Sequence, residues 1–122
     1  MKAKNTRQIG SIGEDRAVTW LLQKGFQIIT RNYRKRGFEV DIVALDIEGV
    51  LRFIEVKTVL HGTEGLAAFS IEHRNIARYF KAVDCFLADN PEYLSNPISM
   101  DAIIVYDEAV KYYPNITSSY IL

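Results

Sequence analysis

Residues 38–59 read FEVDIVALDIEGVLRFIEVKTV, and this stretch decides the fold. Two runs, Glu39 to Asp46 and Val50 to Val59, are rich in β-branched and apolar residues, which predicts two strands. The residues between them, Ile47-Glu48-Gly49, are typical of a short hairpin loop with its glycine in the left-handed conformation. We therefore expect an antiparallel hairpin in which Asp46 pairs with Val50.

This register places Asp41 opposite Glu55, and Glu39 opposite Lys57. Directly opposed side chains have Cβ atoms about 4.5–5.5 Å apart, where two carboxylates repel each other unless a cation lies between them. Mg²⁺ and Mn²⁺ prefer such hard oxygen ligands, and the Lys57 ammonium beside them suits the orientation of a water molecule. The alternative is structural: Glu39 and Lys57 form a cross-strand salt bridge, and Asp41 pairs locally.

The rest of the chain predicts two helices and further strands. Helical spacing of apolar residues indicates a helix over 10–24, with a capping box from Ser11 to Glu14 and a stop at Gly25. A weak strand over 26–30 leads into a basic, mobile connection over 31–37. A second helix over 70–89 ends at Asn90-Pro91, and its apolar stripe comprises Ile76, Tyr79, Phe80, Val83, Phe86 and Leu87. A strand over 98–106 and a short edge strand over 111–113 complete one α/β domain.

Composition excludes several classes of protein. The chain has 122 residues, of which 48% are apolar and 25% charged, and these values are typical of a single globular domain. We expect residues 1–8 to be flexible. No apolar run is long enough to span a membrane, and the first residues do not resemble a signal peptide. With a single cysteine, Cys85, the sequence favours a cytoplasmic protein.

The formal net charge of zero conceals an asymmetry. Residues 1–36 hold nine Lys or Arg and two acids, a net charge of +7, which the other 86 residues balance. Basic side chains are candidates to hold a nucleic-acid backbone, namely Arg31, Arg34, Lys35 and Arg36 in the connection and Arg74, Arg78 and Lys81 on one face of the second helix. An ordinary basic loop and a solvated helix face explain the same pattern.

Several motifs make the chain resemble the YraN family of small bacterial proteins. They are Gly13-Glu14, Gly25-Phe26, Arg31-Asn32-Tyr33, Glu39-Val40-Asp41-Ile42-Val43-Ala44 and Phe53-Ile54-Glu55-Val56-Lys57-Thr58. The resemblance runs from about residue 8 to about residue 88. The sequence departs from the family pattern at Phe38, where glycine is usual, at Val59, where arginine is usual, and at the basic position of the second helix.

The resemblance implies a restriction-endonuclease-like fold of the PD-(D/E)xK superfamily, similar to archaeal Holliday-junction resolvases. In that fold we expect a helix, a three-stranded antiparallel part, a second helix and a further strand in a mixed sheet. The resemblance makes Asp41, Glu55 and the Val56 carbonyl ligands of Mg²⁺ or Mn²⁺. It makes Lys57 the catalytic lysine and Glu14 a helix glutamate that reaches the site.

The sequence thus predicts a metal-dependent, endonuclease-like protein that acts on phosphodiester bonds of DNA, with branched or junction DNA among the candidate substrates, and RNA as the alternative nucleic acid. Symmetric cleavage of a junction needs two active sites, so a homodimer is expected. The alternative is a nucleic-acid-binding or scaffold protein that keeps the nuclease fold and does not cut. A module that binds only proteins is a third hypothesis, and it predicts no salt-dependent binding of DNA.

Overall fold

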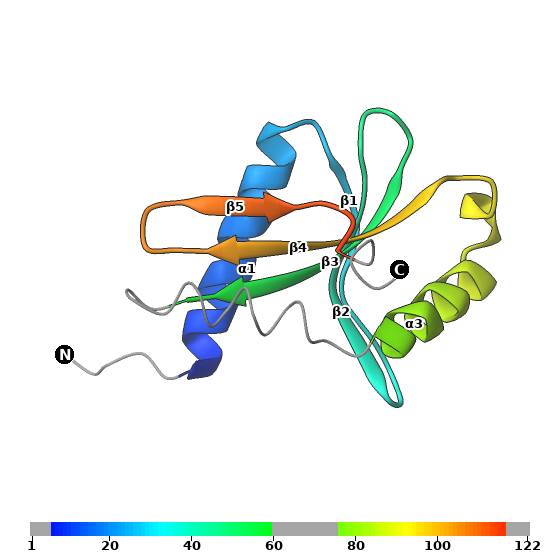
Figure 1. Ribbon diagram of the computed structural model, residues 1–122, viewed down its shortest axis with the longest axis horizontal. Coiled ribbons are helices and arrows are strands. Elements are labelled where there is room, and N and C mark those ends of the chain that lie inside the picture. Colours follow the sequence, from blue (N-terminus) through cyan, green and yellow to red (C-terminus); the bar gives the residue numbers. More distant parts are fainter. Residues whose placement is uncertain (1–5, 60–75, 117–122) are drawn as a thin grey trace.

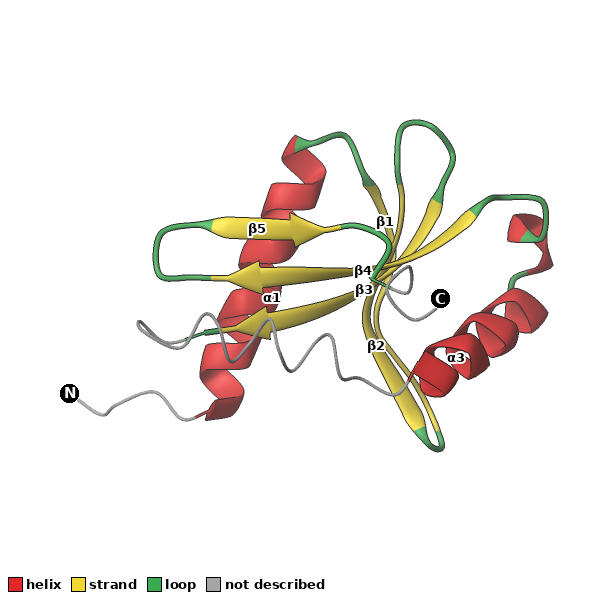
Figure 2. Ribbon diagram, viewed as in Figure 1, coloured by secondary structure: helices red, strands yellow, loops and turns green. Residues whose placement is uncertain are grey.

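The computed structural model of the protein describes residues 6–59 and 76–116. Within these ranges the elements are α1 (Thr6–Gln23), β1 (Gln27–Lys35), β2 (Phe38–Leu45), β3 (Leu51–Thr58), α3 (Ile76–Asp89), the 3-10 turn η1 (Pro91–Tyr93), β4 (Ile98–Val105) and β5 (Val110–Tyr113). The strands form one sheet in the order β1-β2-β3-β4-β5, and β3 and β4 are its parallel pair (Figures 1 and 2). The predicted mixed α/β architecture is confirmed.

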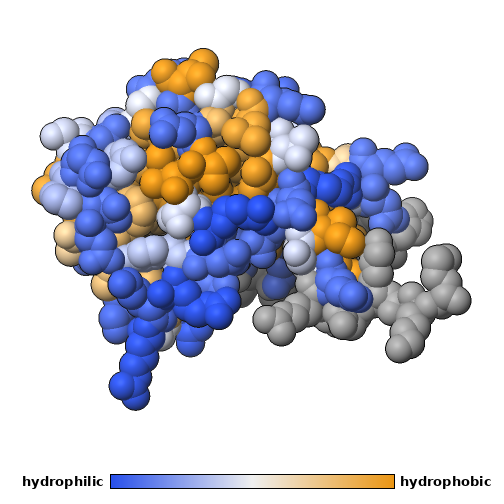
Figure 3. All heavy atoms as spheres, turned by 180° about the vertical axis from the view of Figure 1, so that it is seen from behind, coloured by the Kyte–Doolittle hydropathy of each residue, from blue (hydrophilic) through white to orange (hydrophobic). Residues whose placement is uncertain are grey.

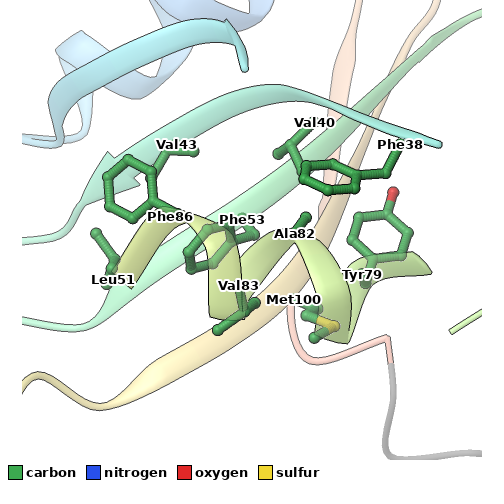
Figure 4. Close-up of a cluster of buried hydrophobic side chains, with 10 residues drawn as sticks. All are labelled: Phe38, Val40, Val43, Leu51, Phe53, Tyr79, Ala82, Val83, Phe86 and Met100. Atoms are coloured by element: carbon green, nitrogen blue, oxygen red, sulfur yellow. The ribbon is translucent and has the colours of Figure 1, made fainter. Parts of the chain in front are cut away.

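The two helices cover opposite faces of the sheet. Neighbouring residues in a strand point to opposite faces. On one face, Val43 and Phe53 pack with Tyr79, Ala82 and Phe86 of α3 (Figure 4). On the other face, the side chains of Ile42, Ala44 and Ile54 pack with Ala17 and Leu21 of α1. Each face of the central hairpin is therefore buried under its own helix, which accounts for the near-continuous apolar runs in β2 and β3.

The predicted register of the central hairpin is confirmed from Leu45↔Leu51 to Ile42↔Ile54, and the paired ladder does not extend to Asp41 and Glu55. Ile42 pairs with Ile54 and Leu45 with Leu51, as expected from the three-residue loop. The Asp46 N–H donates to the Val50 carbonyl, and Gly49 has a φ of +86°, the left-handed conformation that the loop requires.

The first helix begins earlier than predicted. α1 starts at Thr6, so Ser11 and Glu14 lie inside the helix and the predicted capping box is wrong. The expected flexible segment 1–8 also overlaps α1 from Thr6 onward, whereas residues 1–5 lie outside the described part of the chain. The stop at Gly25 is confirmed by its φ of +88° and by hydrogen bonds from the N–H groups of Gly25 and Phe26 to the last turn of α1.

The predicted mobile connection over 31–37 is mostly strand. β1 continues to Lys35 and pairs with β2 from Thr30↔Val43 to Lys35↔Phe38, so that only Arg36 and Gly37 form the turn. Tyr33 provides the physical reason, because its ring packs edge-on against Phe86 with centroids 5.4 Å apart. Tyr33 is surrounded in the sequence by basic residues, and this composition favoured the prediction of a loop.

The apolar stripe of the second helix is partly wrong. Tyr79, Ala82, Val83 and Phe86 form the buried stripe of α3, whereas Phe80 is 55% exposed. Successive helical residues are about 100° apart, so Phe80 points away when Tyr79 points inward. Residues 70–75 of the predicted helix lie outside the described residues, and its end at Asn90-Pro91 is confirmed.

A buried carboxylate at the β3–β4–β5 side of the sheet is fully paired. Asp101 is completely buried and receives hydrogen bonds from the Arg52 guanidinium at 2.9 Å, from the Ser99 and Tyr112 hydroxyls and from the Asn115 N–H. Arg52 also bonds Asp46 at 2.9 Å. This network links the hairpin loop to β4 and β5. Its hydrogen bonds offset the free-energy cost of burying the Asp101 carboxylate.

The surface is not uniformly polar. Seen from behind, hydrophobic side chains gather in one part of the face, beside a strongly hydrophilic part (Figure 3). The large apolar side chains with substantial exposure are Ile12, Leu22, Ile47, Phe80, Leu94 and Ile98. Within the described part of the chain, no helix combines the length and apolar character that crossing a membrane demands.

Close packing of α1 on β3 leads to a prediction about Gly13. A Cβ added at Gly13 would lie 1.8 Å from Thr58 Oγ1 and 3.0 Å from Thr58 Cβ, whereas one added at Gly10 would meet nothing within 4 Å. We expect Gly13→Ala to lower the free energy of unfolding by about 1–3 kcal/mol, because the helix must move off the strand. Gly10→Ala, the matched control, should raise it by up to about 1 kcal/mol through helix propensity. Urea denaturation of both variants measures the difference, and equal effects would contradict the close contact.

Candidate active site

The site forms where β2 leaves β3. The backbone ladder between these strands runs from Leu45↔Leu51 to Ile42↔Ile54. At the next hydrogen-bonded position in this register, Val56 would face Val40, but its N–H donates instead to Asp41 Oδ2 at 2.7 Å. A carboxylate has thus replaced a backbone carbonyl as the acceptor. This exchange fixes the Asp41 side chain between the two strands.

The alternation of side chains along β2 changes phase at the same place. Phe38 and Val40 pack in the cluster beneath α3, and so does Val43 (Figure 4). Strict alternation would send Val43 to the opposite face from Phe38 and Val40. The face that carries the buried side chains of β2 therefore changes between Val40 and Val43, and Asp41, which lies between them, is half-buried.

Glu55 approaches the same place from β3. Its side chain is only 3% exposed, and Oε2 accepts a hydrogen bond of 3.0 Å from the hydroxyl of Tyr79 on α3. Burying a carboxylate is costly unless donors or cations surround it. The helix thus supplies a donor to an acid that the strand has carried into the interior.

Asp41 and Glu55 line one cavity of about 230 Å³, whose other lining residues are Phe38, Glu39, Val40, Arg78 and Tyr79. The hairpin therefore brings the two predicted carboxylates together, on the same side of the sheet. The predicted opposition of Glu39 and Lys57 is wrong, since β2 and β3 have separated there and Glu39 binds Arg34 at 2.9 Å. Lys57 follows Glu55 by two residues, is half-buried, and pairs with Ile104 of β4.

Glu14 reaches this region from α1. Close contact between Gly13 and Thr58 brings this turn of the helix against β3. Burial raises the pKa of the Glu14 carboxyl, and the negative charge of Asp41 raises it further, while Arg31 opposes the shift. Among the described residues, Glu14 Oε1 is buried without a hydrogen-bond partner. The sequence linked Glu14 to the site only through the family resemblance, and it did not show that the surroundings of Glu14 disfavour its charged form.

Most of the predicted nucleic-acid-binding side chains of β1 are paired with acids. Arg31 binds Asp15 at 2.8 Å and lies 3.9 Å from Glu14, so it faces α1. Lys35 lies 3.3 Å from Asp89, and Arg34 binds Glu39 as described above. Within residues 6–59 and 76–116, Arg36 at the hairpin turn and Arg78 at the cavity have no acid within salt-bridge distance. Arg74 lies outside the described residues.

The donor set suits a hard divalent cation. Asp41 and Glu55 contribute carboxylates, and the N–H and C=O of one strand residue point to the same edge, so the Val56 carbonyl faces the Asp41 side. The orphaned Glu14 oxygen adds a further unsatisfied acceptor nearby. No three His, Cys, Asp or Glu side chains in the described ranges converge as a ready metal cage. The residues therefore fit an ion held by two carboxylates, a carbonyl and water.

A family model described as the uncharacterised protein family UPF0102 matches residues 13–105. The chain belongs to this family. It is 36% identical to a UPF0102 protein of Trichlorobacter lovleyi over 71% of this chain and 68% of that protein. It is 37% identical to one of Treponema denticola over 80% and 79% of the two chains, and 35% identical to one of Petrotoga mobilis over 86% and 93%.

Among solved structures, the chain is similar to a repair endonuclease from Pyrococcus abyssi. The two share 13% sequence identity with a TM-score of 0.41, over 88% of this chain and 42% of that one. A likeness at this level carries no argument about chemistry. The membership in UPF0102 confirms the family that the sequence motifs predicted.

Sequence reasoning missed two residues of this region. Tyr79 was predicted as part of an apolar stripe, and Arg31 as a contact for nucleic acid. The signal for Tyr79 was its hydroxyl within an otherwise apolar helix face, since a buried phenol needs a partner. The signal for Arg31 was absent, because only the packing of β1 beside α1 shows that Glu14 and Asp15 are its neighbours.

The raised pKa of Glu14 makes stability depend on pH in a defined direction. Ionised Glu14 destabilises the folded state, so the wild type should lose stability, relative to Glu14→Gln, as pH rises through the elevated folded-state pKa. Below pH about 4, both folded and unfolded Glu14 are protonated and the two proteins should be equally stable. Urea denaturation from pH 3.5 to 8 measures this. Glu108→Gln, at an exposed position between β4 and β5, is the control and should show no such divergence. A Glu14→Gln protein less stable than wild type at pH 8 would contradict the assignment.

Proposed function

We propose that the protein is a metal-dependent endonuclease that hydrolyses phosphodiester bonds of nucleic acid, with DNA as the substrate class. One observation carries the proposal: two acids from neighbouring strands, Asp41 and Glu55, line a single cavity with a cationic side chain, Arg78, at its wall. A stable hairpin has no need of two acids at this place, because like charges on paired strands are destabilising.

The residues that would hold Mg²⁺ or Mn²⁺ are Asp41, Glu55 and Val56 through its carbonyl. A divalent cation, when bound, polarises a phosphoryl oxygen and lowers the pKa of a coordinated water molecule. Asp41 is held for this task by the Val56 N–H, and Glu55 by the phenol of Tyr79. Glu14, on α1, would add negative charge close to Asp41 without lining the cavity.

Two cationic side chains have roles beside the acids. Lys57 lies on β3 two residues after Glu55, and its ammonium would orient the attacking water and stabilise the hydroxide as a proton leaves. Arg78 lines the cavity and would bind a non-bridging oxygen of the phosphate. Contacts of this kind position the backbone without reading base sequence.

A nucleic-acid-binding protein that does not cut is the second candidate. The observation that favours it is the pairing of Arg31, Arg34 and Lys35 with acids, which leaves fewer unpaired cations to position a phosphate for cleavage.

For a branched substrate, the endonuclease proposal includes a homodimer, in which a second copy of the chain would supply the active site for the opposite strand.

Cleavage assays test the proposal directly. The protein is incubated with branched, flapped and single-stranded DNA in Mg²⁺ and in Mn²⁺, and the products are resolved on denaturing gels. We expect metal-dependent cleavage by the wild type, and a loss of at least 100-fold in Lys57→Ala with DNA affinity unchanged, because Lys57 acts on the water. Lys111→Ala, on the edge strand β5, is the control and should cleave as the wild type does. Salt-dependent binding without cleavage would favour the second candidate, and the absence of both would overturn the two alike.

A further inference from the structure

Tyr79 occupies an unusual position among the buried residues of α3. Its ring packs in the cluster that contains Phe38, Phe53 and Ala82, and the side chain is 4% exposed. The hydroxyl lies at the edge of this cluster, beside Phe38 (Figure 4). Tyr79 is also one of the residues of α3 that line the cavity. The ring therefore belongs to the core, while its polar end belongs to the site.

The hydrogen bond from Tyr79 to Glu55 has a defined direction. The Tyr79 hydroxyl donates, and the Glu55 Oε2 atom accepts, across 3.0 Å. Bonds to a charged acceptor are stronger than neutral ones. Glu55 is 3% exposed, so water contributes little to holding it. The Tyr79 hydroxyl thus helps to orient this carboxylate from α3, an element that contributes no acid to the cavity.

Packing alone does not account for a tyrosine here. A phenylalanine would fill the same apolar space, and a buried hydroxyl is costly unless it finds a partner. Elsewhere in the same cluster, Tyr33 packs against Phe86 and its hydroxyl donates to Asp89 on the exposed end of α3 at 2.9 Å. Tyr33 thus provides a natural comparison: the same residue type and bond type, in the same cluster, but directed away from the cavity.

We propose that Tyr79 is a positioning residue that fixes the Glu55 carboxylate for a divalent cation. The inference rests on the proposed function, because it assumes that Asp41 and Glu55 hold Mg²⁺ or Mn²⁺. Partners that orient metal ligands from outside the coordination shell typically change metal affinity by 10–100-fold when they are removed. Tyr79 couples the docking of α3 to the geometry of the site.

The test is calorimetric titration of the metal-free full chain with Mn²⁺, alone and without substrate. Tyr79→Phe keeps the ring and removes the hydroxyl, and we expect its Mn²⁺ affinity to fall by about 10–100-fold. Tyr33→Phe removes an equivalent hydroxyl and should bind Mn²⁺ as the wild type does. Urea denaturation of both variants separates an effect on the fold from an effect on the ligand, since a purely structural role would change stability and not affinity.

The outcomes are distinct. No saturable Mn²⁺ binding by the wild type, or binding unchanged in Asp41→Ala, would remove the proposed metal site and this inference with it. Binding by the wild type that Asp41→Ala abolishes and Tyr79→Phe leaves intact would overturn only the role of Tyr79. A selective loss in Tyr79→Phe supports it. Should that variant fail to fold, substoichiometric Mn²⁺ in the wild type should broaden the Tyr79 ring resonances in NMR spectra before those of Tyr33, and the reverse order would overturn the inference.

Discussion

The hydrogen bond from the Val56 N–H to the Asp41 carboxylate is the interaction on which the site depends. It stands at the position where one more backbone rung would have joined β2 to β3. By taking over that rung, Asp41 satisfies a strand N–H and lets β2 turn away without leaving a buried donor unpaired. The turn opens the cavity, and the same side chain that opens it lines its wall. Asp41 therefore contributes both to the separation of the strands and to the acidic lining of the cavity.

The residues 38–59 specify much of this from the sequence. Their apolar runs and the left-handed Gly49 set the register as far as the Ile42↔Ile54 pair, which leaves Asp41 and Glu55 at the point where the strands separate. The separation of the strands beyond Ile42 and Ile54 was not predictable in the same way. A pairing rule extends a ladder as long as both strands continue, and nothing local shows that a side chain will replace a carbonyl.

The limits of prediction elsewhere have the same physical origin. The many cations of β1 favour the prediction of a basic loop, and its pairing with β2 and the packing of Tyr33 against Phe86 show that it is a strand. α1 begins a turn early although glycines weaken its first half. Gly13 is required there by the approach to Thr58, which is a tertiary constraint that outweighs helix propensity. The family motifs pointed to Asp41 and Glu55, which line one cavity, but they could not describe which donors hold these acids.

Asp101 and Glu14 have different surroundings in this fold. Asp101 is surrounded by an arginine, two hydroxyls and a backbone N–H, the arrangement expected of a carboxylate whose role is structural. Glu14 has an oxygen without a hydrogen bond among the described residues, and the charge of Asp41 raises its pKa. Since the chain fully pairs the acid at Asp101, the Glu14 oxygen that lacks a hydrogen bond among the described residues does not reflect a general failure of packing. Within the proposed function, a divalent cation held by Asp41 and Glu55 would offset the negative charge that raises the pKa of Glu14. Binding of such an ion to the folded state would then add to its stability.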